Sequence, residues 1–459
     1  MDRINLAWMD VVSASGVGLP MNLQKLQLND RFSLGLQRIK SANYSNKGLR
    51  LIGLLLIFCF SCSKSIMPVD SVEVMEQPEK FNVPYGPNVY KPDRSFKVVG
   101  YMTFPNSGHG RDHIQKQPLR GIDYLNLSFL NPNFQGDLVG MNDFDIEFAV
   151  DYLKQNDVKV FVSLAGGLIS NETKANWKRH LNSENRAEFV YKITQFVVNH
   201  KLDGVDVDLE NNLFDEVGPL YESFVVELAQ ALHSYGKAIT SAMYPISLHR
   251  AVTDKALETF DFINVMVYNL RGLWNLNDVG PHSPLSMVDR AYRFWTMEKE
   301  IPPEKLVLGV PFYGWDFDRR KAWSYAQIVS MNPQNAYKDN VEKIYYNGLG
   351  TIVKKVKKAK KAFSGVMFWQ LRQDTTDGLS LIHAIDQTVA ALETEIDCEI
   401  KFYYPDEDMD GLGNPFKPRV ACTQPEGYVT NRDDTDDTTV NENIHSIRVE
   451  NLKIFNGIR

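Results

Sequence analysis

Three acidic residues alternate along one short segment of the chain, Asp206, Asp208 and Glu210, and the residues between them are valine and leucine. Successive side chains of a β-strand point to opposite faces, so in a strand the three acids share one face. Carboxylates spaced roughly 6 to 7 Å apart repel one another, which raises the pKa of each group. A carboxylic acid that stays protonated near neutral pH can act as a general acid, so this segment is a candidate for acid catalysis.

The elements that must position this segment are short β-branched runs alternating with longer amphipathic ones. Segments 185–200, 216–235 and 285–300 have helical periodicity. Eight runs predict strands, which begin near Lys97, Asp123, Val158, Leu202, Lys237, Phe260, Lys305 and Phe363. This alternation predicts an α/β fold, a (β/α)8 TIM barrel, although a doubly wound open sheet also fits. In either fold the chemistry belongs at the carboxyl ends of the strands.

Two other interpretations of the acidic strand stay open. It could be an edge strand with a solvated acidic face, but strands of a parallel barrel are normally apolar on both sides, and here three acids interrupt a valine-rich run. The three carboxylates could also bind a divalent cation. No histidine or further acid recurs at the other predicted strand ends to complete such a shell.

Residues Asp203–Glu210 resemble the DGxDxDxE signature of glycoside hydrolase family 18, the family of chitinases and endo-β-N-acetylglucosaminidases, and all eight residues fit. The resemblance extends over residues 96–392. Four further segments resemble family motifs on the expected strands: 162–167 (SxGG, with Ala165 where glycine is usual), 266–269 (MxYD), 309–314 and 365–369.

This resemblance implies retaining, substrate-assisted endo-hydrolysis of β-1,4-linked N-acetylglucosamine, in chitin-like oligomers or in the core of N-glycans, with no cofactor for catalysis. Glu210 would protonate the leaving oxygen, and the acetamido carbonyl of the sugar would attack the anomeric carbon. Asp208 would orient that acetamido group, and Asp206 would hold a shared proton behind it. Tyr268 would donate a hydrogen bond to the acetamido oxygen, and Trp369 would form the apolar floor under the sugar.

Other residues are candidates for substrate binding, and they are Asn269, Met266, Tyr101 and Phe129. Asn269 stands where the family usually has aspartate, which predicts an altered pH dependence rather than inactivity. The alternative function is a catalytically weak lectin on the same barrel, since family members that lose the acid become lectins. Trp274, Trp315 and Trp323 either extend the groove or pack in the core.

The connection between Gly314 and Phe363 is too short for the α+β domain that deep-cleft chitinases insert there, so we expect a shallower groove, open on that side. The basic run 354–361 within this connection predicts the solvated face of a helix, with Val353 and Val356 turned inward.

The pattern of the N-terminal region predicts a secretory signal followed by a tether. The apolar run 51–60 follows Lys47 and Arg50 and precedes Cys62, and it resembles a bacterial lipoprotein signal in which Cys62 is lipidated. Plain secretion, a retained anchor and a buried helix are the alternatives. We therefore expect a lipoprotein of the bacterial outer membrane or cell surface. We also expect four regions: 1–61 (upstream segment and signal), 62–93 (tether), 94–395 (barrel) and 396–459 (a small acidic, loop-rich C-terminal segment).

The C-terminal segment has the pattern of a calcium loop. Oxygen-bearing side chains alternate at Asp406, Asp408 and Asp410, and a glycine follows for the turn. The segment resembles the short calcium-binding repeats of secreted proteins, which implies a structural Ca²⁺ held by these three residues together with Leu412, Asp434 and Asp436. A cysteine common in such repeats is replaced here by threonine, and Cys398 and Cys422 could pair instead. A merely solvating acidic tail is the alternative.

The charge of the chain is concentrated at this end. Ten acidic residues stand against three basic ones between Asp406 and Glu442, an excess equal to the formal charge of −7 of the whole chain. A nearly neutral barrel argues against a nucleic-acid partner. We expect a monomer that binds an N-acetylglucosamine-containing glycan and meets the membrane through its lipid anchor.

Overall fold

The computed structural model describes residue 93 and the ranges 95–104, 109–117, 119–210, 213–394 and 397–436. The predicted signal segment, most of the tether, Cys62 and the residues after 436 lie outside this part of the chain, so what was expected of them stays a prediction. Within the described residues no helix is both long enough and apolar enough to cross a bilayer.

Eight parallel strands form a closed barrel, because β1 is hydrogen-bonded both to β2 and to β13. This closure confirms the (β/α)8 TIM barrel and excludes the open sheet. In barrel order the strands are β1 (Lys97–Thr103), β2 (Tyr124–Pro132), β4 (Lys159–Gly166), β5 (Gly204–Leu209), β6 (Ala238–Met243), β7 (Phe262–Val265), β8 (Leu306–Pro311) and β13 (Gly365–Trp369). A two-residue strand, β3 (Leu138–Val139), pairs antiparallel with the end of β2.

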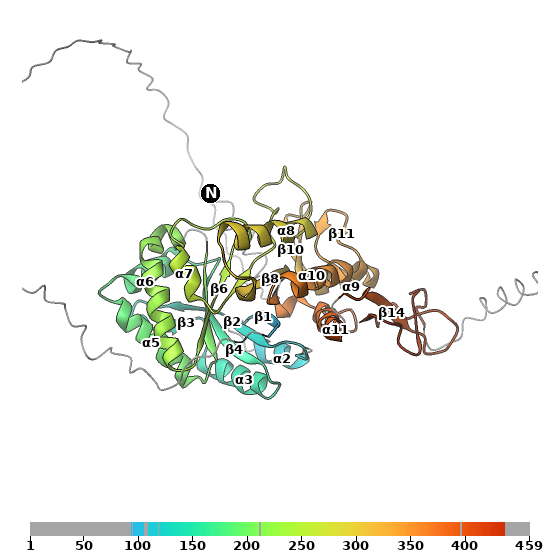
Figure 1. Cartoon of the computed structure of the whole chain (residues 1–459), viewed down its shortest axis with the longest axis horizontal. Helices are drawn as coiled ribbons and strands as arrows, with labels where there is room; N and C mark the ends of the chain where they lie inside the picture. Colours follow the sequence, from blue (N-terminus) through green and yellow to red (C-terminus); the bar gives the residue numbers. More distant parts are fainter. Residues whose placement is uncertain are drawn as a thin grey trace, which may run out of the picture. The chain divides into compact units, whose positions relative to one another are not determined.

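Helices surround the barrel and cover the outer faces of its strands (Figure 1). They are α2 (His109–Lys116), α3 (Asp143–Lys154), α4 (Asn171–Leu181), α5 (Arg186–Asn199), α6 (Leu213–Ser234), α7 (Asp254–Thr259), α8 (Leu285–Arg293), α9 (Tyr325–Met331), α10 (Leu349–Ala362) and α11 (Leu381–Thr394), with short turns η2 (Phe294–Glu298), η3 (Pro303–Lys305), η4 (Pro333–Tyr337) and η5 (Leu371–Gln373). The helix predicted over 285–300 ends earlier as an α-helix and continues as the π-helical turn η2.

The two faces of β5 explain how an acidic strand fits this fold. Val205 and Val207 are fully buried, and Leu209 is 2% exposed. The alternate residues Asp206 and Asp208 are buried as well, so the strand has no solvated face. The edge-strand interpretation is therefore wrong, because β5 pairs with both β4 and β6.

The connection between β8 and β13 is short but ordered into a four-stranded antiparallel sheet, with strands β10 (Lys321–Ser324), β9 (Tyr313–Asp316), β12 (Ile344–Tyr345) and β11 (Asn340–Val341) in that order. Trp315 is fully buried at the centre of this sheet, so it is a core residue rather than an extra subsite. Trp323 and Trp274 are half-buried. The indole N–H of Trp323 donates to the buried carboxylate of Asp316 at 3.0 Å.

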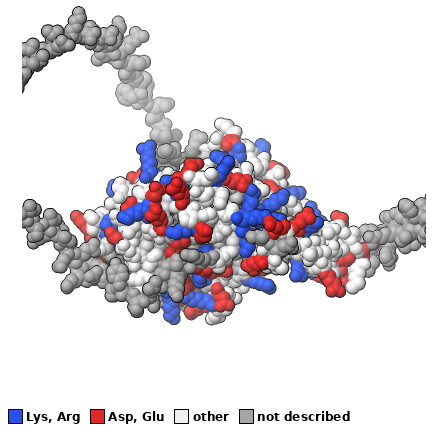
Figure 2. All heavy atoms as spheres, viewed as in Figure 1, with Lys and Arg blue, Asp and Glu red and all other residues white. Residues whose placement is uncertain are grey.

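The basic run 354–361 lies on α10, and the prediction of a solvated face is correct for most of it. Basic and acidic side chains are interspersed on the face shown in Figure 2. Lysines of α10 form ion pairs with acidic residues. The Nζ of Lys358 lies 2.6 Å from Asp289, and the Nζ of Lys360 lies 3.7 Å from Glu393. Lys355 is the exception, because its side chain is fully buried.

The described part of the C-terminal segment forms three short strands, with β14 (Lys401–Pro405) between β15 (Arg419–Ala421) and β16 (Tyr428–Val429). A disulfide joins Cys398 and Cys422, whose Cα atoms are 5.6 Å apart. The segment also contacts the barrel, since the backbone N–H of Val420 donates to Gln387 of α11 at 2.8 Å.

Candidate active site

Asp206 is the innermost acid of β5, and donors from four other strands surround it. Its carboxylate accepts hydrogen bonds from Tyr101 of β1 (2.8 Å), Ser163 of β4 (2.7 Å), Thr240 of β6 (2.8 Å) and Asn264 of β7 (3.4 Å). Burial raises the pKa of Asp206, and these hydrogen bonds oppose the rise by stabilising the anion. The residue is fixed in position by its neighbours and is completely inaccessible to solvent.

Asp208 is the next acid along β5, and it lines a cavity at the end of the barrel. Its Oδ1 is buried and has no hydrogen-bond partner among the described residues. Burial, followed by the nearby charges of Glu210 and Asp206, raises the pKa of Asp208 well above its ordinary value. This carboxyl group therefore tends to hold a proton.

Glu210 follows the last residue of β5 and is 6% exposed. Burial raises its pKa to about 7, and a hydrogen bond from Tyr244 acts in the opposite direction. At neutral pH a large fraction of Glu210 is thus protonated, which is the state that a general acid needs.

Tyr268 and Asn269 follow β7 and have different surroundings. Tyr268 is 5% exposed, and its pKa is raised well above the ordinary value by burial, by Tyr313 and by the acids of β5, so its hydroxyl stays a hydrogen-bond donor. Asn269 has a positive φ of 60°. Its side-chain oxygen accepts from the hydroxyl of Tyr313 at 2.6 Å and the indole of Trp315 at 3.1 Å.

An aromatic group closes the site at the end of β13. The indole of Trp369 stacks on Phe129, with ring centroids 5.5 Å apart and planes 18° from parallel. It also contacts Tyr101, with centroids 5.6 Å apart. These contacts hold the indole face in one orientation, as stacking of a sugar ring requires.

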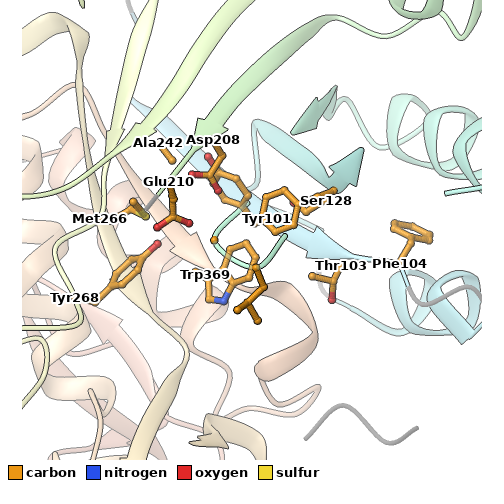
Figure 3. Close-up of a pocket in the computed structure, with 13 residues that line it drawn as sticks. Tyr101, Thr103, Phe104, Ser128, Asp208, Glu210, Ala242, Met266, Tyr268 and Trp369 are labelled. Atoms are coloured by element: carbon orange, nitrogen blue, oxygen red, sulfur yellow. The ribbon is translucent and has the colours of Figure 1, made fainter. Parts of the chain in front are cut away.

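One cavity of about 260 Å³ is lined by Asp208, Glu210, Tyr268 and Trp369. In Figure 3 the carboxyl groups of Asp208 and Glu210 and the hydroxyl of Tyr268 point toward a common space beside Trp369. The residues lining the cavity are Tyr101, Thr103, Phe104, Ser128, Phe129, Gly167, Leu168, Asp208, Glu210, Ala242, Met266, Tyr268 and Trp369.

Most of the site residues predicted from sequence come together here. Asp206 lies beneath the cavity rather than in its lining, where it contacts the other site residues through Tyr101. Asn269 does not line the cavity either, and instead braces Tyr313 and Trp315.

Sequence reasoning missed the residues that support the acids. Tyr244, which binds Glu210, and Thr240 and Asn264, which bind Asp206, were not singled out. A polar residue on an otherwise apolar strand at the level of the acids is a signal that could have identified the last two. Thr103 and Phe104 carry no such signal, because they line the cavity from a strand end and the loop that follows it.

The acidic residues of the C-terminal segment form a second cluster. Asp406, Asp408 and Asp410 each offer an oxygen, and these atoms lie within 4.8 Å of one another. Asp434 is only 6% exposed. Buried carboxylate oxygens without a hydrogen-bond partner occur on Asp406 (Oδ1), Asp408 (Oδ2) and Asp434 (Oδ2).

The other oxygens of this cluster accept backbone N–H groups of the same segment. Asp410 Oδ1 accepts from Leu412 at 2.8 Å, and Asp434 Oδ1 accepts from Asp436 at 2.9 Å. Leu412 and Asp436 thus orient predicted ligands through their N–H groups, and the side chain of Asp436 is exposed.

A TIM barrel with buried, partly protonated carboxyl groups facing an aromatic-floored cavity is typical of a glycoside hydrolase domain. The model of glycosyl hydrolases family 18 matches residues 97–374. The chain therefore belongs to glycosyl hydrolases family 18.

Relatives and solved structures agree with this assignment. Probable chitinase 2 of Drosophila melanogaster is 26% identical over an alignment of 290 residues, and the match covers 50% of this chain and 58% of the length of that protein. The family 18 chitinase ChiB from the chitin utilization locus of Flavobacterium johnsoniae is 36% identical, with a TM-score of 0.60 over 64% of this chain and 94% of that one. A chitinase from Bacteroides thetaiotaomicron is 27% identical, with a TM-score of 0.57 over 64% of this chain and 96% of that one.

Proposed function

We propose that this protein is a retaining, substrate-assisted endo-hydrolase of β-1,4-linked N-acetylglucosamine, with chitin-like oligomers as its substrates. The observation that carries the proposal is the convergence of Glu210, Asp208 and Tyr268 on one cavity beside Trp369. The names of the relatives favour chitin over the N-glycan core, because the similar proteins above are all chitinases.

In the proposed reaction a pyranose ring stacks on Trp369, and protonated Glu210 donates its proton to the glycosidic oxygen as the bond to the anomeric carbon breaks. The acetamido oxygen of the same sugar attacks that carbon and forms an oxazolinium ion. Water then opens this ion with retention of configuration, and Glu210 takes the proton from that water.

Asp208 and Tyr268 position the acetamido group in this scheme. Asp206 takes the proton that the two acids share, and the ionised Asp208, which lines the cavity, then accepts the acetamido N–H and balances the positive charge that develops on the ring nitrogen. The hydroxyl of Tyr268 donates to the acetamido oxygen. Four donors hold Asp206 in place behind Asp208.

Hydrolysis of a fluorogenic chitobioside and of a high-mannose glycoprotein, measured side by side, tests this proposal. We expect cleavage of the chitobioside, with a loss of roughly 10² to 10⁴ in kcat for Glu210→Gln. Glu304→Gln changes an exposed glutamate of η3 and serves as the matched control.

Each other outcome is informative. Cleavage of the glycoprotein alone would replace chitin by the N-glycan core as the substrate. Wild-type inactivity on both, with retained glycan binding, would sink the hydrolase proposal in favour of a lectin.

We also propose that the C-terminal cluster binds a structural Ca²⁺. Its support is the set of three buried carboxylate oxygens without partners, since such oxygens are costly to bury unless a cation or donor meets them. Carboxylate oxygens are the ligands that Ca²⁺ prefers. Asp406, Asp408, Asp410 and Asp434 would hold the ion, and its role would be to order the segment that follows the barrel.

Thermal unfolding and limited proteolysis in Ca²⁺ and in EDTA test this site. In the wild type we expect Ca²⁺ to raise the melting temperature and to slow proteolytic cleavage within the segment that follows Thr394. Asp434→Asn should remove both effects, whereas Asp433→Asn, at an exposed neighbour, should keep them. Equal curves with and without Ca²⁺ would favour a solvating acidic tail.

We propose in addition that the protein is exported and lipidated at Cys62 as a monomeric lipoprotein of the bacterial outer membrane or cell surface. The disulfide between Cys398 and Cys422 supports export, because such bonds persist in oxidising compartments. Labelling with a palmitate analogue in a bacterial host, compared with Cys62→Ser, tests lipidation. Secretion of an unlabelled wild type would show plain export instead.

A further inference from the structure

Lys355 is the one lysine of the basic run on α10 that is fully buried. Its Nζ donates to Ser283 Oγ at 2.5 Å and to Asn347 Oδ1 at 2.7 Å. Both acceptors are uncharged, and burial lowers the pKa of Lys355 to about 7, although Asp339 acts in the opposite direction. Burying a lysine among neutral groups costs free energy, which suggests that its contacts serve a purpose beyond stability.

The contact with Ser283 determines where the hydroxyl proton of that serine points. The Nζ of Lys355 donates to Ser283 Oγ, so this oxygen accepts from the lysine and directs its own proton to another group. That group is the backbone carbonyl of Val267, at 2.5 Å. Asn347 holds the same serine from its other side, because its Nδ2 donates to the carbonyl of Ser283 at 3.2 Å.

Val267 immediately precedes Tyr268, in a segment that has left the barrel sheet. Strand β7 ends at Val265, and the N–H groups of Val267 and Tyr268 close tight turns onto Val265 (2.8 Å) and Met266 (2.7 Å). Met266 is still bonded to β6, since its N–H donates to Met243 at 2.8 Å, but among the described residues no backbone N–H donates to the carbonyl of Val267. The hydroxyl of Ser283 is the group that fixes this carbonyl.

The residue before Ser283 fixes the other end of the same segment. The N–H of Leu270 donates to the carbonyl of His282 at 2.8 Å, and the ring Nε2 of His282 lies 3.2 Å from the carbonyl of Tyr313. His282 and Ser283 therefore contact residues on both sides of Tyr268.

We propose that Lys355 is a positioning residue for catalysis, which acts through Ser283 on the carbonyl of Val267 and thereby fixes the direction in which the hydroxyl of Tyr268 enters the cavity. Lys355 touches no substrate. The proposal rests on the proposed glycosidase function. Displacement of a positioned group by about 1 Å can cost about 10² in rate, so a contact two residues removed from the substrate is able to control turnover.

Three variants test this chain of contacts by steady-state kinetics: Lys355→Met, Ser283→Ala and the double variant. Lys355→Met keeps the stem of the side chain and removes its donors. We expect each single change to lower kcat by about 10- to 100-fold with KM changed less than about 3-fold. The double variant should lose little more than either single one, because both changes break the same contact. Lys358→Met, on the same helix but paired at the surface with Asp289, is the matched control.

Amide hydrogen exchange of residues 266–270 gives a second readout that needs no activity. We expect faster exchange in this segment for Lys355→Met, with unchanged exchange in β5 and with Lys358→Met like the wild type. Additive losses in the double variant, or unchanged kcat together with unchanged exchange, would overturn the proposal. An inactive wild type would refute the hydrolase function, and the exchange measurement would still decide whether Lys355 orders the segment.

Discussion

Glu210 is a carboxylic acid whose environment favours its protonated form. Because its pKa is raised to about 7, the acid is protonated below that pH and ionised above it. We therefore expect kcat/KM to fall about tenfold per pH unit once the pH exceeds about 7, since only the protonated form donates. A profile from pH 4 to 9 checks this, and a rate that stays flat up to pH 9 would contradict it.

A substitution at Tyr244 should shift the alkaline limb of this pH profile, the range in which kcat/KM falls as the pH rises. The hydrogen bond from Tyr244 lowers the pKa of Glu210, so Tyr244→Phe should raise this pKa and shift the alkaline limb to higher pH. The shift can be read from the same profile. A limb displaced toward acid would show that the tyrosine favours the protonated acid instead.

The same residue makes folding stability depend on pH. The pKa of Glu210 is raised from 4.5 to about 7 on folding, so its contribution is fully present below 4.5 and is lost as the pH rises through 7. This loss amounts to about 3 kcal/mol. Urea unfolding should show Glu210→Gln gaining stability over the wild type between pH 5 and pH 8. Parallel pH profiles for the two proteins would argue against a buried acid.

At the scale of elements, the last residue of β4, Gly166, leaves room for the aromatic floor of the cavity. Gly166 has a φ of 83°, and a Cβ built there would lie 2.7 Å from the ring of Phe129, which stacks on Trp369. Gly166→Ala should therefore lower stability by about 1 to 3 kcal/mol and also weaken substrate binding. Unfolding and KM for chitobioside check both effects.

A substitution at Gly427 separates the cost of a positive φ from the cost of the clash with Phe129. Gly427 has a similar φ of 73°, but a Cβ there would meet nothing within 4 Å. Gly427→Ala should show only the cost of the backbone conformation, with KM unchanged. Equal KM in both variants would mean that the floor tolerates a shift of Phe129.

The eight strands were predictable because β-branched runs recur between helical segments, and the acids of β5 because their alternation interrupts an apolar strand. The donors around Asp206 are harder to predict. Ser163 and Thr240 lie beside it on the neighbouring strands β4 and β6. Tyr101 and Asn264 come from β1 and β7, which do not pair with β5, so only the closed barrel brings them to Asp206. The prediction of a solvated face was wrong for Lys355. The five other lysines of the run are at least partly exposed, and a single sequence does not show which of the six lysines contacts a buried serine.

At the scale of the whole molecule, the disulfide encloses three of the four proposed Ca²⁺ ligands. Cys398 and Cys422 are 24 residues apart, and Asp406, Asp408 and Asp410 lie between them. Closing a loop of this length stabilises the segment by about 3 kcal/mol on the chain-entropy model. We expect Cys398→Ser/Cys422→Ser to increase proteolysis of the segment and to weaken its response to Ca²⁺, while hydrolysis by the barrel persists. An unchanged Ca²⁺ response would show that the cluster folds without the bond.

The closure of the barrel also has a consequence for biosynthesis. Strand β1 needs β13 as a neighbour, and β13 begins about 260 residues after β1 ends. At 5 to 20 residues per second, the ribosome takes roughly 13 to 50 s to deliver that partner. Throughout this interval the nascent chain has an unpaired sheet edge at β1, which other chains can pair with. The acids of β5 are made about two fifths of the way through this interval, so their full burial waits for β13, and a chain truncated before Gly365 has no way to complete it.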